Sequence, residues 1–196
     1  MTGNLRIDID RLMARLDALA RVGAIEGGGV CRLALTDEDR AGRNLVVGWM
    51  RELGLAVTID AVGNVFGQRA GRTDDKLVMT VSHIDTVRTG GRYDGNYGVL
   101  AGLEVVETLN RAGVETMRPI AIAFFTNEEG ACFHPDMLGS LAYVGGIGLG
   151  EALAATGIDG AVLGEELGRN VREHTERTDL AAGANVLLQV MVELAG

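Results

Sequence analysis

The chain has 196 residues, of which 47% are hydrophobic and 23% charged, a composition typical of a globular domain and not of a disordered chain. Its formal net charge of −9 argues against a nucleic-acid partner, because binding to a phosphate backbone needs a basic face. The longest uncharged run is too short and too rich in glycine to span a bilayer, so no membrane association is expected.

The cysteines and the start of the chain predict a cytoplasmic location. Cys31 and Cys132 stand alone, without the spacing of a disulfide framework or of a thiolate zinc site, so two free thiols are expected. Residues 1–9 carry charges and lack the apolar core of a signal peptide. Both features favour a reducing compartment.

The first part of the chain predicts two helices and two strands. Apolar residues at helical spacing predict a surface helix over residues 7–22. The run at residues 36–39 combines a capping threonine with three acids, which indicates the first turn of a second helix that ends at Gly54. Residues 55–60 and 64–69 have the composition of a strand pair.

The middle of the chain predicts a βαβ unit. Residues 77–81 and 119–125 are nearly continuous apolar runs, as in strands buried within a sheet, and residues 97–112 between them have helical spacing. A crossover of this kind makes the two strands parallel, so they end at the same edge of the sheet. His83 follows the first strand and Glu128 the second, so we expect these two residues to lie close together.

Short helices are expected in the last third of the chain, over residues 138–144, 150–156 and 161–167. The final helix, over residues 180–194, is apolar nearly all round and is expected to pack against the sheet. Strands alternating with helices in this order predict an α/β fold with a mostly parallel mixed sheet.

His83 and Asp85 stand two residues apart at a strand end, where both side chains can point the same way. A neutral imidazole can bind a metal ion while a carboxylate holds its other ring nitrogen. The alternative is a histidine that only caps the strand through a local hydrogen bond.

Asp94 lies in a glycine-rich loop that leads into a helix. The simplest interpretation is a helix N-cap. A carboxylate held between glycines could instead bridge two metal ions about 3.5–4 Å apart, a pair suited to hydrolysis.

Glu128 and Glu129 are adjacent carboxylates that directly follow an apolar strand, where an unpaired charge is costly. A metal ligand and a general base would be a sensible division of roles between them. The alternative is a solvated acidic turn. His134 is interpreted as loop or pocket lining and His174 as a surface residue.

Several long motifs in order and spacing resemble one enzyme family, at residues 81–87, 90–95, 98–104, 126–131 and 133–140. They are similar to the dimetal amidohydrolases of the M20 peptidase clan, and most similar to its N-carbamoyl-L-amino-acid hydrolases, allantoate amidohydrolases and β-ureidopropionases. The resemblance covers residues 5 to about 168. It implies a three-layer, zinc-peptidase-like catalytic domain of the phosphorylase/hydrolase type.

The resemblance also implies a role for each candidate residue. His83 and Glu129 would bind one metal ion each, Asp94 would bridge the two ions, and Asp85 would orient His83. Glu128 would be the general base. The implied cofactors are two ions of zinc, manganese or cobalt. The implied reaction cleaves the ureido C–N bond of an N-carbamoyl-L-amino acid or an allantoate-like ureide, a small-molecule substrate.

The chain departs from the family in length. Family members carry an inserted lid and dimerisation domain and form homodimers, whereas here residues 169–196 resemble the C-terminal segment of the family directly after residue 168. We therefore expect residues 1–168 and 169–196 to be two parts of one truncated catalytic domain, with the lid absent. The two remaining histidine ligands of the family have no counterpart, since Arg169 stands at one of these positions and His174 does not match it. An incomplete metal site is thus implied.

Two further functions stay open. One is a catalytically impaired member of the family that binds metal weakly. The other is an M20-type metallopeptidase that acts on peptide bonds. Metal stoichiometry distinguishes the first of these from an active amidohydrolase, and a comparison of ureide with peptide substrates distinguishes the second.

Overall fold

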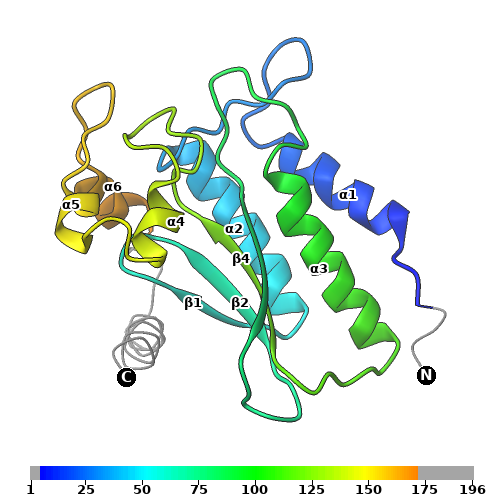
Figure 1. The fold of residues 1–196 in the computed structure, drawn as a ribbon. Coiled ribbons are helices and arrows are strands. Elements are labelled where there is room, and N and C mark those ends of the chain that lie inside the picture. The colour runs from blue at the N-terminus through cyan, green and yellow to red at the C-terminus, as the bar shows by residue number, and fades with distance from the viewer. Residues whose placement is uncertain (1–4, 172–196) are drawn as a thin grey trace.

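The computed structural model describes residues 5–171. The predicted final helix and most of the predicted C-terminal segment lie outside these residues. The described elements are α1 (Ile9–Ala20), α2 (Asp37–Glu52), β1 (Ala56–Ile59), β2 (Val65–Arg69), β3 (Val78–His83), α3 (Asn96–Arg111), β4 (Ile120–Phe125), α4 (Leu138–Tyr143), α5 (Leu149–Leu153) and α6 (Leu163–Asn170) (Figure 1).

The four strands form one mixed sheet in the order β1-β2-β4-β3. β3 and β4 are parallel, in register from Val78 opposite Ile120 to His83 opposite Phe125, which confirms the predicted βαβ unit. β1 and β2 form the predicted strand pair and run antiparallel. The expectation of a mostly parallel sheet is wrong for the described residues, because the β1–β2 hairpin brings β2 antiparallel to β4.

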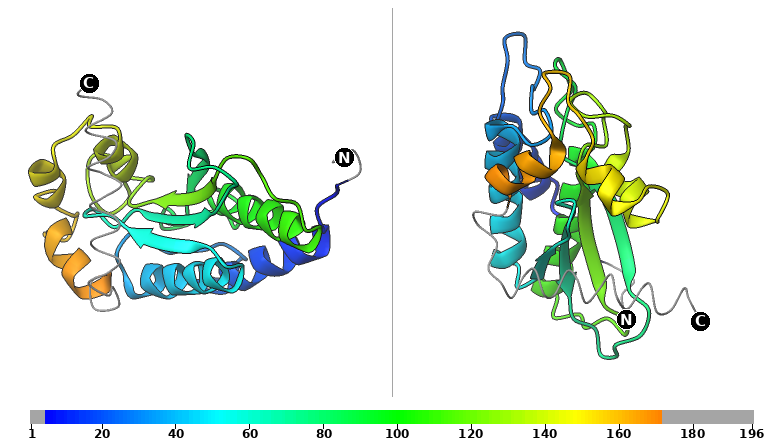
Figure 2. Two further views of the ribbon diagram at one scale, coloured as in Figure 1. Left: turned by 90° about the horizontal axis from the view of Figure 1, so that it is seen from below. Right: turned by 90° about the vertical axis from the view of Figure 1, so that its left-hand side faces the viewer.

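Helices α1, α2 and α3 cover one face of the sheet (Figure 2). Their apolar stripes meet Val65, Ile122 and Phe124 in a core whose helical members include Leu19 and Met50, all at most 1% exposed. A second apolar cluster, centred on buried residues of α6 and its neighbouring loops, lies beyond the end of the sheet, where α4, α5 and α6 gather. These observations confirm an α/β domain. Over most of the described sheet there are two layers, the sheet itself and the helices α1, α2 and α3 on one face (Figure 2).

The helix ends follow the local signals in the sequence. The Thr36 side chain accepts a hydrogen bond from the Asp39 amide, and three acids occupy the first turn of α2, as predicted. α1 is capped in the same way by Asp8. α3 ends just before Gly113, which has a φ of 61°.

Within residues 5–171, no helix combines the length and the apolar character that a membrane span requires. Cys31 and Cys132 are both free and half-buried, as expected.

Candidate functional site

The loops that follow β3 and β4 meet at one edge of the sheet, as the predicted crossover requires. Asp85, just after β3, is 2% exposed, and its carboxylate accepts hydrogen bonds from the backbone amides of Glu128 and Glu129, at 3.3 and 3.2 Å. Asp85, at the end of β3, therefore orients the loop that carries Glu128 and Glu129.

His83 ends β3, and its ring is held by backbone. The Nδ1 atom lies 3.0 Å from the carbonyl oxygen of Asp85 and 3.7 Å from its carboxylate. Because a carbonyl only accepts, Nδ1 carries the proton in this contact, and Nε2 keeps the lone pair that a metal ion requires. The hydrogen-bond partner of the ring is thus the backbone carbonyl of Asp85, and the Asp85 carboxylate, which also accepts from two amides, lies at ion-pair distance from the ring.

Asp85 is a buried carboxyl with an unusual acidity. Burial and the nearby charge of Asp39 raise its pKa to about 6, against the opposing effects of His83 and of the two amides. The group is fixed in place and surrounded by protein, which suits an orienting role better than direct contact with a substrate.

Asp94 is exposed, and it does not cap α3 through its side chain. The N-cap residue is Gly95, with a φ of 64°, so the N-cap interpretation of Asp94 is wrong. Gly95 lies against His83 so closely that a Cβ atom at this position would overlap the imidazole ring. The loop at Asp94 and Gly95 therefore packs directly on the candidate histidine ligand.

Glu128 and Glu129 are both half-buried, so the turn that they form is not fully solvated. Burial raises the pKa of the Glu129 carboxyl, His83 lowers it, and the charge of Asp94 raises it again. The charge of Asp94 thus lies near enough to Glu129 for the two carboxylates to repel each other. A cation placed between them would relieve this repulsion.

One imidazole and two carboxylates are the donor set that a divalent ion such as zinc or manganese accepts. The chemistry of these residues therefore fits a metal site. Within the described part of the chain, however, no three histidine, cysteine, aspartate or glutamate side chains are placed so that they could hold a metal ion together.

Glu128 is held by Ser140, a residue that the sequence pattern did not single out. One carboxylate oxygen accepts from the Ser140 amide and the other from its hydroxyl, each at 2.9 Å. Ser140 belongs to the first turn of α4, so this helix fixes the orientation of Glu128. The only signal in the sequence is that residue 140 falls within one of the family motifs.

Arg32 lies behind the site and is 0% exposed. Its guanidinium donates to the carbonyl oxygens of Ile84, Leu19 and Val22 and to Oδ1 of Asn96, at 2.7 to 3.0 Å. Burial lowers its pKa, while the charges of Asp39 and Asp85 oppose this effect. An arginine within the apolar run at residues 30–35 was the available signal, and sequence reasoning missed it.

A second buried network supports the end of β4. Arg43 forms an ion pair of 2.7 Å with Asp39 and donates to the hydroxyl of Thr126 at 3.1 Å. The amide of Thr126 donates to Oδ1 of Asn64 at 2.9 Å. Asp39 and Arg43 on α2 and Asn64 just before β2 thereby fix the strand end from which Glu128 and Glu129 follow.

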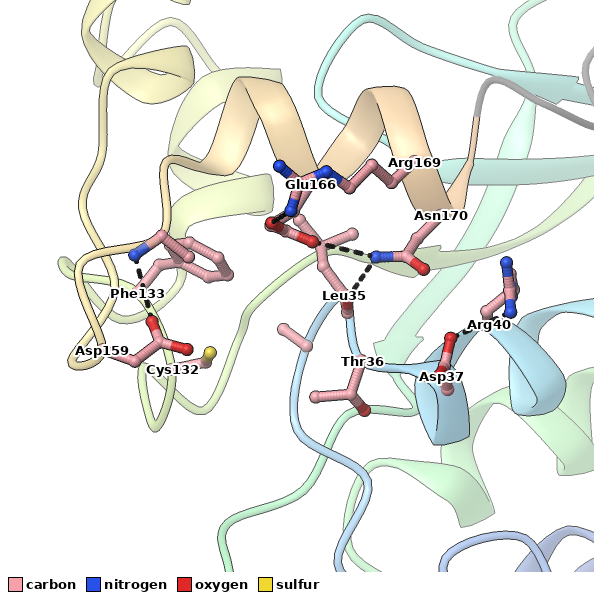
Figure 3. Close-up of a pocket in the computed structure, with 12 residues that line it drawn as sticks. Leu35, Thr36, Asp37, Arg40, Cys132, Phe133, Asp159, Glu166, Arg169 and Asn170 are labelled. Atoms are coloured by element: carbon pink, nitrogen blue, oxygen red, sulfur yellow. Dashed lines mark hydrogen bonds and ion pairs between the residues drawn. The ribbon is translucent and has the colours of Figure 1, made fainter.

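A cavity of about 480 Å³ opens between the start of α2, the loop at Phe133 and α6 (Figure 3). None of the five candidate residues lines it. Its two arginines are already paired, Arg40 with Asp37 at 2.9 Å and Arg169 with Glu166 at 2.6 Å. The cavity is therefore separate from the strand-end site, and its positive charges are neutralised.

The fold and the strand-end residues define an α/β domain with zinc-peptidase-like structural neighbours. Aminopeptidase PepT from Bacillus cereus shares this fold at 18% identity and a TM-score of 0.52, over 63% of this chain and 38% of that one. The chain belongs to peptidase family M28, whose family model matches residues 64–173.

Relatives with higher identity confirm the resemblance to amidohydrolases. A hydantoinase/carbamoylase family amidase from Burkholderia ambifaria is 51% identical with a TM-score of 0.82, over 84% of this chain and 41% of that one. The N-carbamoyl-L-amino acid amidohydrolase of Geobacillus stearothermophilus is 45% identical over 164 residues, which are 76% of this chain and 40% of the relative. The ureidoglycolate hydrolase of Arabidopsis thaliana is 37% identical, over 82% of this chain and 34% of the relative. The chain thus spans 34–41% of the length of these three relatives.

Proposed function

We propose that this chain carries part of the active site of a metal-dependent amidohydrolase that cleaves the ureido C–N bond of N-carbamoyl-L-amino acids or allantoate-like ureides. The observation that carries this proposal is the meeting of His83, Asp85 and the Glu128–Glu129 turn at one sheet edge, in a chain 45% identical to an N-carbamoyl-L-amino acid amidohydrolase. The activity of the relatives is the basis for the choice of substrate.

His83 through Nε2, Asp94 and Glu129 are the proposed ligands for two divalent ions, with Asp94 between them. Bound zinc, manganese or cobalt would polarise the ureido carbonyl and acidify a water molecule. The chain contributes the orientation of these groups. The Asp85 carbonyl fixes the His83 tautomer, and the Asp85 carboxylate holds the turn that carries Glu129.

Glu128 is the proposed general base. Ser140 occupies one acceptor position on each of its oxygens, and each oxygen keeps a second lone pair that can accept a proton from water. Because both oxygens are fixed, the carboxylate is oriented before a substrate arrives. A carboxylate in this role takes a proton from the attacking water and returns it to the departing nitrogen.

The test is metal-dependent release of ammonia from N-carbamoyl-L-amino acids and from allantoate. We expect Glu128→Gln to lower the rate by a factor of about 10²–10⁴, because the amide cannot take a proton. Glu151→Gln, on the exposed side of α5, is the matched control and should keep the full rate. Absence of any metal-dependent rate from the unaltered chain would contradict the proposal.

Two observations favour alternative functions. Among the described residues, no three candidate ligands are placed to hold a metal ion together, which favours an impaired member of the family with weak metal binding. The match to peptidase family M28 favours a metallopeptidase. Bound metal without turnover would support the first alternative, and cleavage of peptides but not of ureides would support the second.

A further inference from the structure

The turn that carries Glu128 and Glu129 belongs to a closed loop, residues 126–139, which runs from the end of β4 into the first turn of α4. Backbone hydrogen bonds of 2.9 to 3.3 Å join its two sides at the base, from Gly139 to Thr126, from Leu138 to Asn127 and from Met137 to Glu128. The two sides lie so close that a Cβ atom at Gly139 would be 2.5 Å from the amide nitrogen of Thr126. Glu128 is thus part of the base, and Glu129 follows it directly.

The Asn127 side chain joins this base to the far part of the loop. It is 0% exposed, and its Oδ1 atom accepts a hydrogen bond from the amide of Phe133 at 3.2 Å. Its Nδ2 atom donates to the carbonyl oxygens of Phe133 and Pro135, at 2.8 and 3.2 Å. An amide side chain offers an acceptor and two donors on one carbon, whereas an ionised aspartate here would face two carbonyl oxygens without a proton to donate. Phe133 is itself buried in the second apolar cluster, so these bonds anchor the loop to the core.

The backbone conformation at residue 127 also favours asparagine. Asn127 has a φ of 56°, in the left-handed region that asparagine adopts more readily than most residues. Because Asn127 directly precedes Glu128, this conformation sets the direction in which the two glutamates leave β4. Met137, on the opposite side of the base, has a similar φ of 53°, but its side chain is 53% exposed. Met137 therefore supplies a comparison for backbone strain without the buried hydrogen bonds.

Closure of the loop brings Ser140 to Glu128. Asp85 binds the backbone amides of Glu128 and Glu129, on the first side of the loop. Ser140 directly follows the second side, 12 residues after Glu128, and reaches its carboxylate through the amide and the hydroxyl, each at 2.9 Å. If the two sides separated, Asp85 would still hold the glutamate amides, but the Glu128 carboxylate would lose Ser140. The orientation of this carboxylate therefore depends on the bonds that keep the loop closed.

We propose that Asn127 is a positioning residue for the hydrolysis. By holding residues 126–139 closed, it keeps the Glu128 carboxylate on Ser140 and keeps Glu129 at the strand end before a metal ion or a substrate binds. Groups held in this way lose little freedom when the reaction begins, which is the basis of their effect on the rate. Asn127 is buried and acts through the two glutamates. The roles of these glutamates rest on the proposed function, and the closure of the loop does not.

Amide hydrogen exchange in the metal-free chain tests the closure. The Ser140 amide reports whether Glu128 is in place, because it donates to that carboxylate. In Asn127→Gly, which permits the left-handed φ but removes three hydrogen bonds, the Ser140 amide should exchange faster by a factor of about 10 or more. Met137→Gly is the matched control and should leave this exchange unchanged.

Amides within α3 and β4 separate opening of the loop from unfolding of the domain, and they should exchange in Asn127→Gly as in the unaltered chain. If Asn127→Gly does not fold, Asn127→Asp makes the same comparison, because it keeps the shape of the side chain and loses both Nδ2 donors. Equal exchange of the Ser140 amide in the Asn127 variant and in Met137→Gly would overturn the proposal.

Zinc affinity and metal-dependent release of ammonia test the consequence for the site. Asn127→Gly should bind zinc more weakly by a factor of about 10, and at saturating zinc its kcat should fall by a factor of about 10 or more. Met137→Gly should keep both values. If the unaltered chain neither binds zinc nor releases ammonia, the proposed function fails, and exchange at Ser140 still decides whether Asn127 closes the loop. Unchanged zinc affinity and kcat in an Asn127→Gly chain whose Ser140 amide exchanges faster would overturn the positioning role.

Discussion

One glycine sets the position of the candidate ligand His83. Gly95 has a φ of 64°, and a Cβ atom at this position would overlap the imidazole. Gly113 has a similar φ of 61° but has no atom within 4 Å of such a Cβ, so it supplies a control for backbone strain alone.

We expect Gly95→Ala and Gly113→Ala to lose similar stability from strain, about 1 kcal/mol each. Only Gly95→Ala should also displace His83 and weaken binding of zinc, by a factor of about 10 or more. Calorimetric titration with zinc, together with urea denaturation, separates the two effects. Equal zinc affinity in the two variants would show that His83 does not bind the ion.

Arg32 is the buried cation on which the first strand end depends. Four hydrogen bonds from its guanidinium join α1, the loop after β3 and α3. Arg32→Met should lower the free energy of unfolding by about 3 kcal/mol, because it leaves buried acceptors without donors. Arg72→Met, which removes an exposed pair with Glu115, should cost less than about 1 kcal/mol. Urea denaturation measures both, and similar losses would contradict the role given to Arg32.

Residues with characteristic chemistry were predictable from the sequence, and their partners were not. His83, Asp85, Glu128 and Glu129 stand out because polar groups directly follow apolar strands. Ser140 and Arg32 act through contacts 12 and 64 residues away, with Glu128 and Asn96. No local pattern encodes a contact of that kind.

At the scale of elements, an ion-pair network joins α1 to α3. The Glu104 side chain is 0% exposed and lies 2.6 Å from Arg11, and Glu107 pairs with Arg15. Burial raises the pKa of Glu104, but hydrogen bonds from Arg11, the Asp8 amide and Thr108 outweigh this effect and leave the pKa below its ordinary value. The pKa of Glu107 is lowered in the same manner.

This network makes the stability of the fold depend on pH. Because the folded pKa of Glu104 lies below its unfolded value, its contribution is complete above pH 4.5 or so and is lost as the pH falls through the folded pKa. Glu104→Gln should therefore cost about 2 kcal/mol at pH 7 and much less at pH 3. Urea denaturation at the two pH values measures the difference. If the stability lost in Glu104→Gln were the same at both pH values, the ion pair between Glu104 and Arg11 would not be the source of the loss.

The helices and the βαβ unit were predictable because their signals are local. Helical spacing and the cap at Thr36 place α1, α2 and α3 within one or two residues of their observed ends. The antiparallel pairing of β2 with β4 was not predictable, because it joins segments about 55 residues apart whose composition suits either direction.

At the level of the whole molecule, the chain has the fold of its family and spans 34–41% of the length of the relatives described above. The structural match to the Burkholderia ambifaria amidase covers 84% of this chain but only 41% of that one. The described residues supply one imidazole and two carboxylates as candidate ligands. The proposed metal site belongs to this part of the fold.

The most direct test of the account is metal content after dialysis against zinc or manganese, measured by elemental analysis for the unaltered chain, Glu129→Ala and the control Glu151→Ala. We expect two ions per chain in the unaltered and control proteins. In Glu129→Ala, the affinity for metal should be lower by a factor of about 10 or more. No retained metal, or equal retention in all three proteins, would contradict the assignment of a metal site to the loops that follow β3 and β4.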